Sequence, residues 1–236
     1  MKKIILILIT LLITGLYANA DLNATIEKLS KASVKAYKEG DYHKVIQLEK
    51  ESYSLGKKES SDYVAMMYRF KLYDFNTAIT WYQKGIDRAD GDSAYSMACM
   101  YEDILKYNLA EKYYLIAVKL GHEGSTYALG LLYNDKLNND IKAIEWYKKA
   151  IDIKDANGAF ALGILYRTEK KDYKEAEKWF IKALKMKHRN APYNLARLYE
   201  NDLKEYEKAI EVYKYFLASH PNDKEVKETI KRLESL

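Results

Sequence analysis

The sequence predicts an all-α fold, a right-handed α-solenoid of about six helix-turn-helix repeats followed by a C-terminal capping helix. Two prolines and ten glycines in 236 residues leave little material for hairpin turns. Large, mostly aromatic pairs such as Trp146-Tyr147 recur along the chain, each three and four residues after an alanine. A period in the low thirties is typical of one supersecondary unit stacked on copies of itself. The alanines that mark this period are Ala78, Ala110, Ala143, Ala176 and Ala209.

We predict that residues 21–236 form one helical-repeat domain. The spacing of these alanines sets the boundaries of its repeats. Apolar residues recur at spacings of three and four in both halves of each repeat, which is the helical period. The last segment, 221–236, carries Val226, Ile230 and Leu233 on one side and charged residues elsewhere, as a cap requires. The predicted units lie at about 22–56, 57–90, 91–122, 123–155, 156–187 and 188–220.

Small residues predict where the two helices of a repeat meet. One small residue in each first helix lies three positions before a repeat tyrosine, so two backbones can approach closely there. Asp172 with Glu175, and Asn108 with Glu111, have the spacing of a capping box at the start of a second helix. The small residues are Ala65, Ala98, Gly130, Gly163 and Ala196.

Residues 1–20 have the pattern of a secretory signal peptide. Lys2 and Lys3 precede an apolar run over 4–13, and Ala18-Asn19-Ala20 forms a small-residue cleavage site. We therefore expect an exported bacterial protein, periplasmic or extracellular, with no membrane span after cleavage. An uncleaved anchor is the alternative, but the apolar run is shorter than the roughly 20 residues that a spanning helix needs.

The composition argues against nucleic acid as a partner. The net charge is +5, from 39 basic and 34 acidic residues, and the two signs are mixed along every segment instead of clustered. Nucleic-acid-binding proteins concentrate basic residues on one face. The single cysteine, Cys99, cannot form an intrachain disulfide; it is interpreted as a partly buried packing residue, with a reactive thiol as the alternative.

No motif predicts catalytic residues, a metal site or a cofactor. Ser54 and Lys57 have the Ser-x-x-Lys spacing of serine beta-lactamases, but the other motifs of those enzymes are absent. Gly56 is better explained as a helix C-cap. The histidines lack the spacing of metal ligands, and three of them fall near the end of a second helix, where a positive charge favours the helix dipole. Those three are His122, His188 and His220.

Two series of residues in the first helices are candidates for partner binding through a concave groove. The first is an aromatic ladder, which either binds a protein or peptide or packs between neighbouring repeats. It consists of Tyr95, Tyr127, Phe160 and Tyr193. The second follows the repeat tyrosines and varies from copy to copy, as specificity positions would. It consists of Arg69, Glu102, Asn134, Arg167 and Glu200.

Residues 128–133 (ALGLLY), Asp140 and 142–150 (KAIEWYKKA) resemble the Sel1-like repeat, a relative of the tetratricopeptide repeat. Residues 161–166, Asp172 and 174–183 resemble it too, and the similarity extends over about 60–220. The loop within each repeat is short and poor in glycine, closer to the tetratricopeptide form. The sixth unit, which ends at Pro221-Asn222-Asp223, is also tetratricopeptide-like.

The resemblance implies a non-enzymatic scaffold that binds a protein or peptide and needs no cofactor. The alternative is a penicillin-binding or beta-lactamase-like enzyme, since secreted cysteine-rich members of the Sel1-like group are associated with those activities. Those members carry a cysteine pair in each repeat, which this chain lacks. The sequence leaves the partner's identity and the oligomeric state open.

Overall fold

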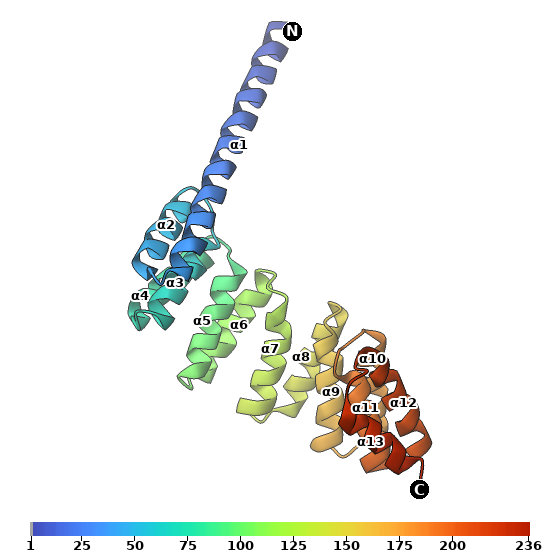
Figure 1. The fold of residues 1–236 in the computed structure, drawn as a ribbon. Coiled ribbons are helices and arrows are strands. Elements are labelled where there is room, and N and C mark those ends of the chain that lie inside the picture. Colours follow the sequence, from blue (N-terminus) through green and yellow to red (C-terminus); the bar gives the residue numbers. More distant parts are fainter. Residues whose placement is uncertain (1) are drawn as a thin grey trace. The chain divides into compact units, whose positions relative to one another are not determined.

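The computed structural model describes the backbone of residues 2–236 and the side chains of residues 19–236. Every regular element in this part of the chain is a helix, which confirms the all-α fold of stacked repeats (Figure 1). The predicted signal peptide, 1–20, lies outside the described side chains except for its last two residues, so it stays a prediction. Among the described residues, no helix is both long and apolar enough to cross a bilayer.

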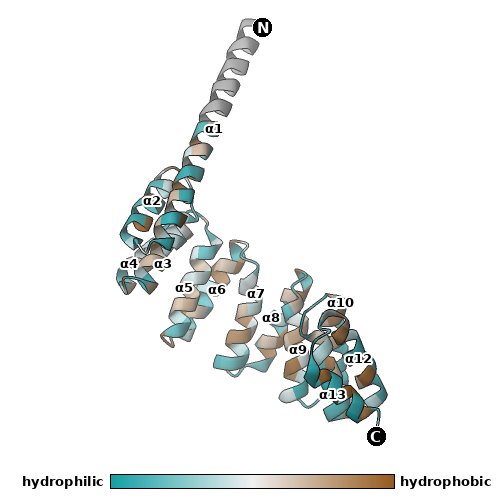
Figure 2. Cartoon of the chain, viewed as in Figure 1, coloured by the Kyte–Doolittle hydropathy of each residue, from teal (hydrophilic) through white to brown (hydrophobic). Residues whose placement is uncertain are grey.

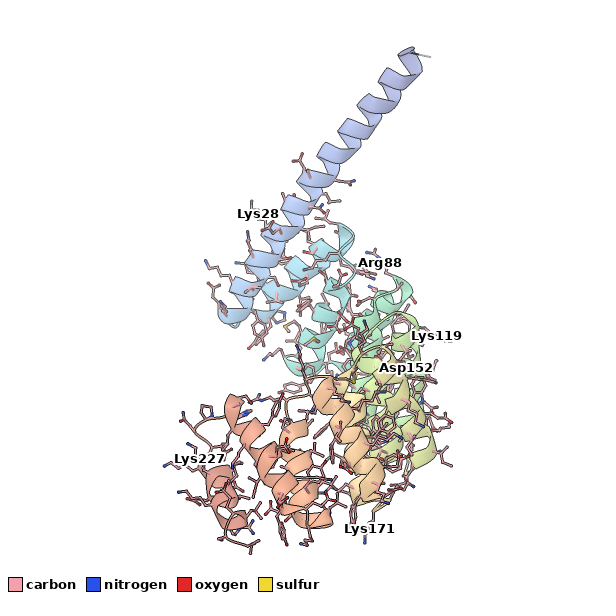
Figure 3. The ribbon with its side chains drawn as sticks, turned by 90° about the vertical axis from the view of Figure 1, so that its right-hand side faces the viewer. Lys28, Arg88, Lys119, Asp152, Lys171 and Lys227 are labelled. Carbon is pink, nitrogen blue, oxygen red and sulfur yellow. The ribbon has the colours of Figure 1, made fainter. Side chains whose placement is uncertain are left out.

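The chain divides into two compact units, Met1–His122 and Glu123–Leu236. The N-terminal unit contains three helical pairs. Its helices are α1 (Lys2–Lys38) and α2 (Tyr42–Ser54), α3 (Ser60–Phe70) and α4 (Phe75–Asp87), and α5 (Gly91–Asp103) and α6 (Tyr107–Lys119). At the end of α4, Arg88, labelled in Figure 3, donates to the Tyr53 carbonyl oxygen at 2.7 Å and ties α4 to α2.

The C-terminal unit contains three more pairs and a last helix. Two first helices end in a π-helical turn, η1 and η2, whose i→i+5 bonding is rare. That the two units form one continuous domain stays a prediction. The elements are α7 (Gly124–Leu131) with η1 (Leu132–Lys136), α8 (Asp140–Asp152), α9 (Ala156–Thr168), α10 (Tyr173–Lys185), α11 (Ala191–Arg197) with η2 (Leu198–Leu203), α12 (Tyr206–Ser219) and α13 (Lys224–Leu233).

Side-chain caps start most of the second helices. Asp172 accepts a hydrogen bond from the Glu175 amide at 3.1 Å, which is the cap that the sequence predicts at the start of α10. The prediction that Asn108 caps α6 is wrong, because α6 begins at Tyr107 and Asn108 lies inside the helix. The residue before the helix is Lys106, whose side chain makes no capping hydrogen bond. Further capping residues are Asp41, Asp74, Asp90, Asn139, Asp155 and Asp223.

Short turns reverse the chain between helices, and most contain one residue in the left-handed conformation. Glycine suits this conformation best, but only Gly40, Gly56 and Gly121 supply it here. Gly56 ends α2 in this way, with φ of +105°, as a C-cap glycine does. Eight other residues adopt positive φ: Tyr73, Ala89, Leu105, Asn138, Lys154, Lys171, Lys187 and Lys204.

Small residues let the paired helices pack closely, as predicted. A Cβ atom added at Gly163 on α9 would lie 2.5 Å from the ring of Phe180 on α10, and one at Gly130 would overlap the Tyr147 ring. The repeat alanines of the second helices, Ala143 and Ala176 among them, are fully buried. Figure 2 shows hydrophobic and hydrophilic residues sharing each helix, as expected when one side faces a neighbour.

The last helix covers the final pair. Val226, Ile230 and Leu233 on α13 are buried in one cluster with Tyr213 and Phe216 of α12. Most other residues of α13 are exposed and polar. This confirms the predicted capping face.

We expect Gly163→Ala to lower the free energy of unfolding by about 1–3 kcal/mol, because the added methyl overlaps the Phe180 ring in a packed contact. Chemical denaturation measures this. Asn157→Ala, at an exposed position of the same helix, is the control. Equal stability of Gly163→Ala and wild type would mean that the helices are not in this close contact.

Candidate functional site

The rings of the predicted aromatic ladder pack inside their own repeats. All four are half-buried, and each faces an aromatic ring on the second helix of the same pair. The centroid distances are 5.5 Å for Tyr95–Tyr114, 5.9 Å for Tyr127–Tyr147, 5.9 Å for Phe160–Phe180 and 6.1 Å for Tyr193–Tyr213. Aromatic pairs at such distances stabilise a core. The ladder therefore has a packing role within each repeat.

Three histidines stack on aromatic rings. The centroid of His122 lies 4.2 Å from that of Tyr95, and His188 lies 4.1 Å from Phe160. His220 stacks on Phe216 at 4.2 Å. Burial lowers the pKa of His188, which disfavours the charged form of its ring. For His188, burial and stacking on Phe160 therefore argue against the interpretation as a charge on the helix dipole.

The second predicted series connects neighbouring repeats within each unit. Arg69, only 6% exposed, pairs with the Asp103 carboxylate and donates to the Ser96 carbonyl oxygen at 3.2 Å. In the C-terminal unit, Arg167 pairs with Asp202 at 2.6 Å, Asn134 donates to Glu169 at 3.2 Å, and Glu200 pairs with Arg232. Each partner lies 32 to 35 residues further along. Three of the five candidates therefore bridge successive first helices, and Glu200 bridges to the capping helix α13.

Glu102 is the exception in this series. Its carboxylate accepts a hydrogen bond at 2.9 Å from the Tyr114 hydroxyl of its own repeat. Cys99 lies beside this pair, with its sulfur 3.3 Å from the same hydroxyl. Burial raises the pKa of the Cys99 thiol, which disfavours the thiolate form that a reactive cysteine needs. This supports the interpretation of Cys99 as a packing residue.

A buried carboxylate lies close to the Arg69 bridge. Burial, reinforced by the negative charges of Asp90 and Asp92, raises the pKa of Asp62 on α3 to about 6. Ser96 and Arg69 oppose the shift. Because the folded pKa lies above that of an unfolded aspartate, the folded state binds the proton more tightly, and this contribution to stability is lost as pH rises through about 6.

The N-terminal unit has an apolar hollow between α1 and α3, with α2 beneath it. Its volume is about 420 Å³. Tyr63, Tyr37 and Val34 are each about half-exposed at its rim. Beneath them, the buried Glu49 accepts from the Ser60 hydroxyl at 2.6 Å, and Lys57 donates to Ser30 at 2.9 Å. The lining residues, which we call the N-terminal groove, are Ser30, Ser33, Val34, Tyr37, Lys38, Val45, Glu49, Lys57, Tyr63, Met66 and Met67.

Sequence reasoning missed the N-terminal groove. None of the predicted candidates lines it, because the first repeat matches the repeat pattern poorly and supplied no candidate. The available signal was the apolar spacing of Val34 and Tyr37, and of Tyr63 and Met66. Each pair lies three residues apart, so its two side chains share one helix face.

The C-terminal unit has a smaller, polar hollow beside α13. Its volume is about 270 Å³, and Tyr193 and Glu200 are the two predicted candidates that the structure brings together there. The buried Glu200 carboxylate already accepts from the Tyr213 hydroxyl at 2.6 Å and pairs with Arg232. The remaining lining residues are Arg197, Asn201, Tyr213, Glu225, Val226, Thr229 and Arg232.

The Ser54 and Lys57 side chains are engaged with different partners. The Ser54 hydroxyl donates to the Glu51 carbonyl oxygen at 2.7 Å, at the end of α2. The Lys57 ammonium lies near Ser30 and Glu49 instead. The geometry gives no support to the beta-lactamase alternative. Within the described side chains, no group of three or more potential ligands could hold a metal ion.

Tetratricopeptide-repeat models match three segments, residues 125–157, 158–189 and 193–227. No curated protein matches the sequence. The three segments all lie in the C-terminal unit, where the sequence follows the repeat pattern most closely.

Solved helical-repeat structures are similar to this fold. A Sel1 repeat protein from Oxalobacter formigenes is 19% identical, with a TM-score of 0.58 over 89% of this chain and 87% of its own. PilF of Pseudomonas aeruginosa is 12% identical, with a TM-score of 0.60 over 89% and 99%.

A third similar structure is c5321, a protective antigen of uropathogenic Escherichia coli with a Sel1-like repeat fold. It is 22% identical, with a TM-score of 0.57 over 78% of this chain. This chain spans 44% of the length of c5321.

We expect Asp62→Asn to raise the free energy of unfolding by about 1–3 kcal/mol at pH 7.5, because it removes a charge that burial disfavours. The gain should shrink as the pH falls below about 6, where wild-type Asp62 binds a proton. Denaturation at both pH values measures this. Asp152→Asn, at the exposed site labelled in Figure 3, should show no such dependence. A constant difference between Asp62→Asn and wild type at both pH values would contradict a raised pKa.

Residues 125–157, 158–189 and 193–227 thus match the tetratricopeptide repeat, and the helical-repeat fold of this chain is similar to that of Sel1 repeat proteins.

Proposed function

We propose that this chain is a non-enzymatic scaffold that binds a protein or peptide in the N-terminal groove. The observation that carries the proposal is the exposure of Val34, Tyr37 and Tyr63 around one apolar hollow. Aromatic and methionine side chains are enriched where proteins recognise one another. Tetratricopeptide and Sel1-like repeats typically mediate such binding, which supports a scaffold over an enzyme.

The groove has features that suit an extended or helical peptide. Tyr63 and Tyr37 offer large contact area at low entropic cost, because each has only two side-chain torsions. Met66 adapts its shape to the ligand. Lys38 adds positive charge at the rim, whereas Lys57 beneath it already pairs with Glu49. A ligand with an apolar face and a carboxylate near Lys38 therefore fits best.

Export of the chain is part of the proposal. The dibasic start, the apolar run over 4–13 and the Ala18-Asn19-Ala20 site support it. A periplasmic or extracellular location would follow. The size of the mature chain in the exported fraction, measured by mass spectrometry, tests it; a chain that retains residues 1–20 would contradict cleavage.

We expect a photo-crosslinking residue at position 63 to capture a protein in cells, because Tyr63 lies at the rim of the groove. The same residue at position 215 should not capture it, since exposed Tyr215 lies on α12, outside the groove. Adding Val34→Asp should reduce the adduct at position 63 at least about tenfold, because a charge in an apolar contact costs more than 1.4 kcal/mol. An adduct unaffected by Val34→Asp, in a protein with a wild-type thermal melt, would place the binding surface elsewhere.

A further inference from the structure

A glycosylation motif lies in α1, shortly after the predicted cleavage site. Asn23-Ala24-Thr25 has the Asn-x-Thr form of an N-glycosylation acceptor, with alanine and not proline at the middle position. Asp21 stands two residues before Asn23, so the segment has the longer Asp-x-Asn-x-Thr form of a bacterial acceptor. No other asparagine of the sequence is followed two residues later by serine or threonine. The motif therefore singles out one asparagine in the chain.

The structure leaves this motif accessible. The side chains of Asp21, Asn23 and Thr25 are all exposed. Among the described side chains of α1, the first fully buried one belongs to Ser33, ten positions after Asn23 and therefore about 15 Å further along the helix. Figure 1 shows this end of α1 projecting past α2. The packed repeats of the N-terminal unit therefore leave Asn23 open to an enzyme.

The motif can leave the helix at low cost once the predicted signal peptide is removed. Cleavage after Ala20 would make Asp21 the first residue of α1, and the first four amide groups of a helix have no partner within it. Chain ends that bury no side chain fray readily. The Thr25 hydroxyl donates to the Asp21 carbonyl oxygen at 2.9 Å, a bond within this turn that fraying releases. The segment can then extend into the active site of a transferase.

We propose that Asn23 is the acceptor of an N-linked oligosaccharide, attached by a transferase that uses a polyprenyl-pyrophosphate-linked donor. The Asn23 side-chain nitrogen bonds to the anomeric carbon of the first sugar, as the bond from that carbon to the pyrophosphate oxygen breaks. Polyprenyl pyrophosphate leaves with the electron pair, and the amide nitrogen loses one proton to a base of the transferase. The modification rests on export, which is part of the proposed function, and is independent of the N-terminal groove.

Each residue of the motif has a separate role in this reaction. The Asn23 amide supplies the nitrogen of the new bond. The Thr25 hydroxyl hydrogen-bonds to the transferase, so serine can replace it and alanine cannot. The Asp21 carboxylate pairs with a basic side chain of the transferase. Changes at these three positions should therefore affect the modification in different ways.

Mass spectrometry of the chain from the exported fraction of its own bacterium tests the proposal. We expect the peptide that begins at Asp21 to carry the added mass of an oligosaccharide. Asn23→Gln and Thr25→Ala should each abolish the added mass, whereas Thr25→Ser should retain it. Asp21→Asn should reduce the modified fraction. Asn157→Gln, at an exposed asparagine outside such a motif, is the matched control and should leave the added mass unchanged.

The outcomes separate the modification from export. A chain that begins at Asp21 and carries no sugar would overturn the proposal while leaving export intact. A chain that retains residues 1–20 would contradict export and the modification together. Sugar that persists in Asn23→Gln would lie on another side chain and would also overturn the proposal. Because the motif lies outside the packed repeats, we expect every variant to keep the thermal melt of wild type.

Discussion

The close approach of a small residue to an aromatic ring is the constraint on which the repeats depend. At Gly163 and Gly130 there is no space for even one methyl group beside the Phe180 and Tyr147 rings. This contact sets the distance between the paired helices, and the neighbouring apolar side chains fill the space that remains. A ring of the first helix, such as Phe160 or Tyr127, then packs against the same partner ring.

Ion pairs between neighbouring repeats help to fix how the repeats pack on one another. Arg69 with Asp103 and Arg167 with Asp202 connect the ends of successive first helices. A buried charge that loses its partner is costly, so these pairs disfavour any other register between the neighbouring repeats. The bridges also engage most of the polar side chains that follow the repeat tyrosines, which are the positions that differ from one repeat to the next. The binding surface that we propose for this chain therefore lies where neither the ring contacts between paired helices nor the bridges between repeats use the side chains.

The candidate site was less predictable than the fold. The ladder and the variable series were identified from their phase in the repeat, and the structure shows packing contacts for the first and bridges for most of the second. The position of a residue within the repeat predicts which helix face it lies on. It does not predict which side chains of a neighbouring helix contact that face. His188 illustrates the same point: its place near a helix end suggested a charge, whereas stacking on Phe160 and burial favour a neutral ring.

The sequence by itself determined the repeat period, the helical pairs, the cap at Asp172 and the apolar face of the last helix, because these depend on contacts between residues close in sequence. The tertiary structure decided which side chains remain available. The N-terminal groove combines residues from different helices, and Asp62 acquires its raised pKa from burial among neighbouring elements. Burial, stacking and pairing across repeats arise only when the helices pack, so no single segment contains them.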